Sequence, residues 1–170
     1  TQDKNYGEAV AQSIALDRRN KVYGDKILSI ARTSAEAGDL ESALTAYKYL
    51  VDKGPVESKP PQPGRNIAVQ PPYQAARIEY LLILSEITLL DQESIPKDWE
   101  DLAGQFALTI EELGEDPRLV QPVISELARI KAYRLSDSTE ALGILDKALE
   151  TKGLPVTIRS QYLMEKGDIL

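Results

Sequence analysis

Apolar residues recur at every third or fourth position along most of the chain, which is the spacing that places them on one side of an α-helix. Glycine or proline follows several of these stretches, and both residues are typical of helix ends. No stretch shows the strict alternation of a strand. The pattern predicts an all-α fold of about eight helices, over residues 5–19, 21–37, 40–53, 73–90, 97–113, 118–134, 138–151 and 156–170.

Six of the ten prolines lie between residues 55 and 72, where the helical rhythm stops. Proline has no amide donor and disfavours helical geometry in the residue before it, so we expect no helix here. We interpret the segment as a loop inserted between helix pairs, with a lid or a hook for a partner as the alternative. The predicted organisation is one domain over 1–170, with a helix at 5–19, repeats at 22–54, 73–114 and 118–153, the insertion at 55–72, and half a repeat at 156–170.

Two similar five-residue segments lie thirty-four residues apart. Residues 5–9 read NYGEA and residues 39–43 read DLESA, so that Ala9 and Ala43 occupy matching places. A period of this length is typical of stacked helix-turn-helix units. The clearest unit, 24–57, combines apolar, small, aromatic and helix-ending residues at Ile27, Ile30, Ala31, Gly38, Ala43, Tyr47, Leu50 and Pro55.

This unit resembles a tetratricopeptide repeat, in which small residues let two helices approach and an aromatic residue fills the groove to the next unit. Ser34 departs from the pattern, because the family usually has tyrosine there. The resemblance implies a right-handed α-solenoid of antiparallel helix pairs. It also implies a non-enzymatic scaffold that binds a protein or peptide partner through a concave face formed by the first helix of each pair.

In the clearest unit the resemblance places Asp25, Leu28, Arg32 and Ala35 on that binding face. Arg32 is the strongest candidate contact, because a guanidinium group can hold a carboxylate through two hydrogen bonds. A solvated Arg32 without a partner is the alternative. The lysine and asparagine set with which some of these domains bind a C-terminal carboxylate is not supplied by Leu28 and Arg32.

The stretch from residue 126 to residue 170 resembles large tetratricopeptide proteins of Bacteroidetes, notably at 146–150 and 164–170. This resemblance suggests a bacterial cell envelope or periplasmic location, with the cytoplasm left open. The phase of the repeats, which begin with the second helix of a pair and end within a first helix, suggests a fragment of a longer solenoid. Further repeats of the parent chain would then cover four apolar residues of the last helix, Val156, Ile158, Leu163 and Ile169.

The composition removes several kinds of chemistry. The chain contains no cysteine and no histidine, which excludes disulfides, thiol nucleophiles, zinc clusters of the common type and a histidine base. Trp99 belongs to an apolar stripe and is expected in the core. No phosphate-binding or calcium-binding motif occurs, so no cofactor is expected. The longest apolar run, 80–84, is too short to span a membrane.

The charge is unevenly distributed. Residues 91–116 contain nine acids and one base, a net charge of −8, whereas the whole chain carries −7. No basic stripe for nucleic acid is present. The acidic segment is either a solvated helix face or a docking surface for a basic partner.

Three functional hypotheses remain open. A binding scaffold is favoured. The alternatives are a structural spacer and a subunit of a larger enzyme or envelope assembly whose catalytic part lies elsewhere. Adjacent acids on a helix point in different directions, so pairs such as Glu111 and Glu112 are poor candidates for catalysis.

Overall fold

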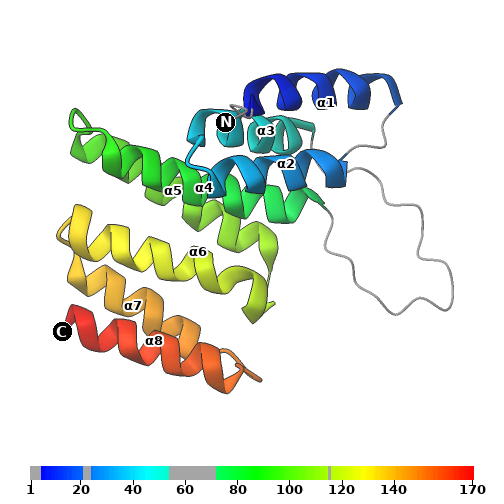
Figure 1. Cartoon of the computed structure of the whole chain (residues 1–170). Helices are drawn as coiled ribbons and strands as arrows, with labels where there is room; N and C mark the ends of the chain where they lie inside the picture. Colours follow the sequence, from blue (N-terminus) through cyan, green and yellow to red (C-terminus); the bar gives the residue numbers. More distant parts are fainter. Residues whose placement is uncertain (1–4, 21–23, 54–71, 115) are drawn as a thin grey trace, which may run out of the picture. The chain divides into compact units, whose positions relative to one another are not determined.

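The computed structural model describes residues 5–20, 24–53, 72–114 and 116–170, and this part of the chain is helical without any strand (Figure 1). The all-α prediction is confirmed. The proline-rich insertion predicted at 55–72 lies outside the described residues except for Pro72. The elements are α1 (Tyr6–Asn20), α2 (Gly24–Glu36), α3 (Leu40–Lys53), α4 (Pro72–Leu90), α5 (Pro96–Leu113), α6 (Pro117–Arg129), the π-helical turn η1 (Ile130–Arg134), α7 (Ser138–Leu149) and α8 (Val156–Ile169).

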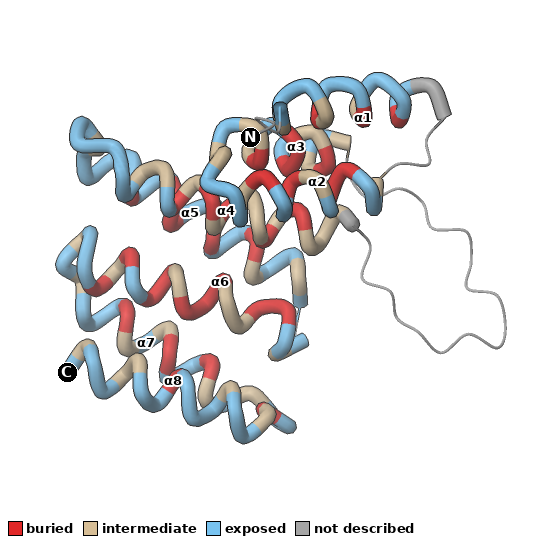
Figure 2. The backbone as a smooth tube through the Cα atoms, in the orientation of Figure 1, coloured by how far each residue is buried: buried red, intermediate tan, exposed pale blue. Residues whose placement is uncertain are grey.

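The chain divides into two compact units. Unit 1 covers Thr1–Leu84 and unit 2 covers Ser85–Leu170, so that the boundary falls inside α4. Along the helices, buried and exposed segments alternate, which is the expected result when each helix packs through one side (Figure 2).

Unit 1 is built on the pair α2 and α3, which share the most extensive helix contact in the unit, with α1 packed against both. Ala31 and Ala43 are completely buried. A side chain no larger than a methyl group allows two helix backbones to approach closely. Tyr47 is also buried and supplies the bulk of α3 that faces inward.

The turn between α2 and α3 depends on Gly38. Its φ angle is +80°, a region that disfavours residues with a Cβ atom. The amide of Asp39 donates to the carbonyl of Ser34 at 2.9 Å, and the amide of Gly38 donates to the carbonyl of Ala35 at 2.9 Å. These bonds satisfy carbonyls that the end of α2 leaves unpaired. The glycine stop predicted at this position is confirmed.

A buried carboxylate joins α1 to α3. Asp17 is 1% exposed, and one of its oxygens accepts hydrogen bonds from the Tyr49 hydroxyl at 2.8 Å and from Lys53 Nζ at 2.5 Å. A charged group loses its hydration when it is buried, so a matching cation and additional hydrogen bonds are needed to offset that cost. This cluster therefore fixes α1 against the helix pair.

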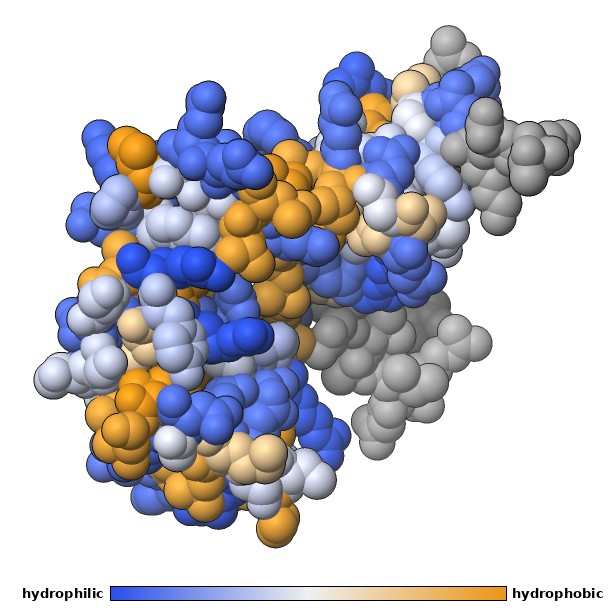
Figure 3. Space-filling view, turned by 60° about the vertical axis from the view of Figure 1, so that its left-hand side comes forward, coloured by the Kyte–Doolittle hydropathy of each residue, from blue (hydrophilic) through white to orange (hydrophobic). Residues whose placement is uncertain are grey.

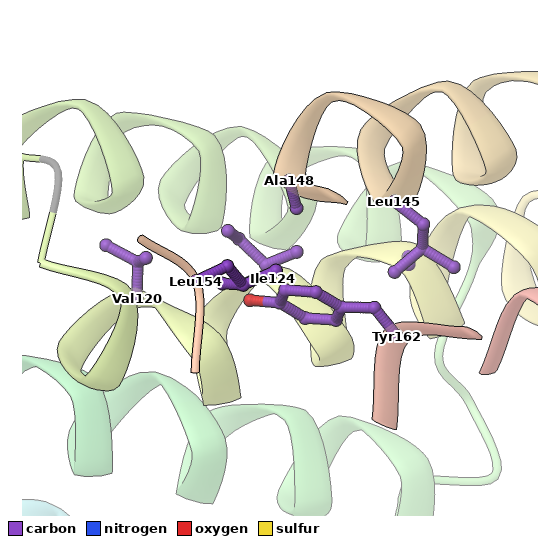
Figure 4. Packing of buried hydrophobic residues seen from close by; sticks show 7 residues of the cluster. Val120, Ile124, Leu145, Ala148, Leu154 and Tyr162 are labelled. Carbon is purple, nitrogen blue, oxygen red and sulfur yellow. The ribbon is translucent and has the colours of Figure 1, made fainter. Parts of the chain in front are cut away.

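Unit 2 is organised around α6, which contacts α5, α7 and α8. Because α6 has neighbours on several sides, most of its side chains are buried (Figure 2). The core cluster contains residues from α6, α7, α8 and the connection between the last two: Val120, Ile124, Ala128, Leu145, Ala148, Leu154 and Tyr162 (Figure 4).

Local signals set the helix starts in unit 2. Pro96 and Pro117 each stand near the beginning of a helix, where the missing amide costs nothing. Asp116 accepts a hydrogen bond from the Arg118 amide at 3.0 Å, and Asp137 accepts one from the Glu140 amide at 2.9 Å. The Glu140 carboxylate forms an ion pair with Lys131 Nζ at 2.8 Å.

The helix predicted at 118–134 ends as an α-helix at Arg129 and continues as the π turn η1. In this wider turn the amide of Leu135 donates to the carbonyl of Ile130 at 3.1 Å. The guanidinium carbon of Arg134, at the end of the turn, lies 5.3 Å from the ring centre of Trp99. Trp99 is buried, which confirms its predicted place in the core.

Polar contacts hold α8 in place. Ser125 Oγ of α6 donates to Glu165 at 2.9 Å, and Lys166 pairs with Asp146 of α7. The other side of α8 is apolar and exposed, with Val156 at 78% and Leu163 at 54% exposure. Figure 3 shows apolar residues beside charged ones in its lower part, over α7 and α8. Ile158 and Ile169, which the sequence pattern placed in the same uncovered set, pack instead against the core cluster.

Candidate functional site

The four residues predicted for the binding face differ in accessibility. Asp25 and Arg32 are exposed and Ala35 is partly buried, all on α2. Leu28 is only 7% exposed and belongs to the core of unit 1. The side of α2 that carries Leu28 therefore packs within the unit and leaves this side chain largely inaccessible.

The guanidinium group of Arg32 already holds a carboxylate of the same chain. Its Nε atom lies 3.0 Å from both oxygens of Glu79 on α4, and a terminal nitrogen lies 2.5 Å from Oε1. The hydrogen bond with Glu79 raises the pKa of Arg32 above its ordinary value. Arg32 thus forms the kind of contact with a carboxylate that a guanidinium group favours, and the carboxylate belongs to the same chain.

A hollow is present within unit 2. It has a volume of about 710 Å³, within the range of pockets that hold small ligands or anchoring side chains. We call it the unit-2 groove. Its lining comes from α5, α6, α7, α8 and the connection between α7 and α8, and includes Ala107, Ile110, Glu111, Val120, Ile124, Leu127, Ile144, Lys147, Ala148, Glu150, Lys152, Leu154 and Tyr162.

The floor of the groove is part of the core of unit 2. Val120, Ile124 and Leu127 stand four and three residues apart on α6, so they lie on one side of that helix. Ala148 and Leu154 contribute to the same surface, and all five residues are largely buried. A floor made of packed core residues is preformed, so a ligand would not have to order it.

Tyr162 brings a polar atom to this apolar surface. Its side chain is 1% exposed, and the ring extends from α8 towards Ile124 and Leu154 (Figure 4). The hydroxyl forms no hydrogen bond within the described chain. Yet no described side-chain polar atom is both sealed from solvent and unbonded. The hydroxyl therefore keeps some contact with solvent, and Tyr162 is one of the residues that line the groove.

Burial raises the pKa of Tyr162 to about 12, with a smaller contribution from the negative charge of Glu165. The phenol therefore keeps its proton at neutral pH. A neutral hydroxyl can donate one hydrogen bond and accept others, so it can recognise either kind of polar group on a ligand.

Charged side chains form the rim. Glu111 stands on α5, Lys147 on α7, and Glu150 and Lys152 on the connection that follows. All four are exposed, and none forms an ion pair within the described chain. The two carboxylates are solvated, unlike the desolvated acids that perform proton transfer. Among the described residues no three metal-binding side chains come together.

The sequence analysis did not predict a role for Tyr162, although its helical spacing from Ile158 was a signal that it belongs to the core. Ile158 and Tyr162 are four residues apart, and both pack against the core cluster, as does Ile169. Because α8 is apolar on both sides, its helical pattern does not distinguish the inner side from the outer one. Asp17 was missed for a related reason: it follows Val10 and Ser13 on one buried side of α1, where a lone acid is easily taken for a surface residue.

Searches against family models, curated proteins and solved structures found no match to this chain. None of the described helices has the length and hydropathy needed to cross a membrane.

Proposed function

We propose that this protein is a binding scaffold that holds a peptide segment of a partner protein in the unit-2 groove. The observation that carries the proposal is Tyr162, which lines a preformed apolar hollow and whose hydroxyl has no hydrogen-bond partner in the described chain. A few polar groups in a mostly apolar hollow are characteristic of binding sites. The volume of about 710 Å³ suits one or two bulky anchoring side chains.

Within this proposal the helix pairs form a right-handed solenoid of the tetratricopeptide type. The thirty-four-residue spacing of Ala9 and Ala43 and the short connection between α2 and α3 support it. The binding surface, however, differs from the face that the resemblance implied. Arg32 is engaged by Glu79 and Leu28 is buried, whereas the groove of unit 2 remains accessible.

The test uses two tryptophan substitutions on neighbouring exposed positions of α5. Ala107 lines the groove, and Leu108 does not. Ala107→Trp fills the groove from its wall, and Leu108→Trp adds the same ring elsewhere. A phage-displayed peptide library is selected on the full chain, and the recovered peptides are measured by fluorescence anisotropy.

We expect peptides that bind the wild type and Leu108→Trp equally and bind Ala107→Trp at least about tenfold more weakly, a difference of about 1.4 kcal/mol. Circular dichroism checks that both variants keep the helical content of the wild type. Recovery of peptides that bind all three proteins equally, or of none at all, contradicts the proposal.

A further inference from the structure

The two sides of the unit-2 groove carry opposite charge. Glu111 is the charged residue of the α5 side. The side formed by α7 and its following connection carries Lys147 and Lys152 with one acid, Glu150. Since these side chains form no ion pairs within the described chain, their charges are available to a ligand.

The negative charge on the α5 side continues beyond the groove. Helix α5 and its flanks form the acidic segment 91–116, which has a net charge of −8. Its described acids are exposed. Opposite charge on two walls fixes the orientation of a bound partner and excludes ligands with the wrong pattern.

We infer that the groove selects an amphipathic helical peptide that has an apolar anchor, a basic residue on the flank facing α5 and an acidic residue on the flank facing α7. This inference rests on the proposed function and adds the chemistry of the partner to it. The buried Tyr162 hydroxyl marks the position of the anchor. The rim charges determine which flanking residues are accepted.

The probes are three capped peptides of about 15 residues, a length at which a helix begins to be stable. They share one apolar stripe with a central leucine and tyrosine. The dipolar peptide carries lysines on one flank and glutamates on the other. The neutral peptide carries glutamine on both flanks, and the basic peptide carries lysine on both.

We expect the dipolar peptide to bind the wild type roughly three- to fivefold more tightly than the neutral one, the size typical of exposed ion pairs. Glu111→Lys and the double variant Lys147→Glu/Lys152→Glu should each remove this advantage. The triple reversal should restore it, because a helix that binds in the opposite direction exchanges its flanks. The advantage should also vanish at about 1 M salt, where charges are screened within about 3 Å.

If all three peptides bind every charge variant equally and lose binding to Ala107→Trp, the charge inference is wrong and the proposed function stands. Tightest binding by the basic peptide also overturns the inference, since it would show a uniformly acidic surface. If no peptide binds the wild type, both claims fail.

Discussion

Arg32 of α2 and Glu79 of α4 form an ion pair across forty-seven residues of sequence, with Arg32 Nε at 3.0 Å from both carboxylate oxygens. The buried Tyr47 of α3 lies beside them. Burial, and after it the hydrogen bond and charge of Glu79, raises the pKa of Tyr47 well above its ordinary value. These three residues connect the first half of α4 to the α2 and α3 pair, a connection that no local pattern specifies.

A double-mutant cycle on Arg32→Ala and Glu79→Ala should give a coupling of about 0.5–1 kcal/mol. The two side chains are 51% and 25% exposed, so solvent screens part of their attraction. The measurement is urea unfolding followed by circular dichroism. The matched control is the fully solvated pair Lys48 and Asp52 of α3, for which we expect no measurable coupling. Equal coupling for the two pairs would show that the ion pair of Arg32 with Glu79 does not stabilise the packing of α4.

Replacing Asp17 by alanine should loosen α1. The buried carboxylate holds Tyr49 and Lys53, and its loss leaves both without their common acceptor. We expect a cost of about 2 kcal/mol, below the usual range for buried pairs, because Lys53 reaches solvent. Hydrogen exchange should accelerate in α1 and stay unchanged in α6. Glu8→Ala, an exposed change on α1, is the control, and equal exchange in the two variants would contradict the assignment.

Two glycine substitutions should change stability in opposite directions. Gly38 has a φ angle of +80°, so Gly38→Ala strains the turn after α2 by about 1 kcal/mol. Gly104 lies inside α5, where an added methyl group would meet no atom of another element within 4 Å, so Gly104→Ala should stabilise the helix by up to about 1 kcal/mol. Thermal unfolding should shift by about 2–4 °C in each direction. Shifts of the same sign would refute this prediction.

Alkaline pH should destabilise the fold through Tyr162. The pKa of its phenol is about 12 in the native state, against about 10 in an unfolded chain. Between these values the native state keeps the proton that the unfolded state releases, so the free energy of unfolding falls as pH rises. The loss is at most about 2–3 kcal/mol by pH 12.

The measurement for Tyr162 compares the wild type with Tyr162→Phe by urea unfolding from pH 9 to 12. Phenylalanine keeps the ring and has no proton to release, so the wild type should lose more stability than the variant over this range. If the two proteins lose stability equally over this range, the pKa of Tyr162 is not raised in the native state. Absorbance of tyrosinate provides an independent reading of the same titration.

Much of the secondary structure could be predicted because its signals are local. The end of α2 depends on Gly38, and the start of α6 depends on Asp116 and Pro117. The π turn was not predictable in this way. Its distinguishing contact, Arg134 on the ring of Trp99, joins residues thirty-five positions apart.

The candidate site was less predictable than the helices. The family resemblance directed attention to α2, where Leu28 proved buried and Arg32 engaged. The groove requires four helices to be placed together, and its residues come from positions 107 to 162. Helical periodicity shows that a side is apolar, but it does not show whether a neighbouring helix covers that side completely.

Residue types and short-range patterns were enough to establish that this protein is helical, where most helices begin and end, and that chemistry based on cysteine or histidine is absent. Each of these properties depends on one residue or on neighbours within a few positions. The burial of Asp17, the pairing of Arg32 with Glu79 and the place of Tyr162 in the lining of a groove became known from the folded chain alone. Those outcomes depend on which helix sides meet, and that is set by packing among residues far apart in the chain.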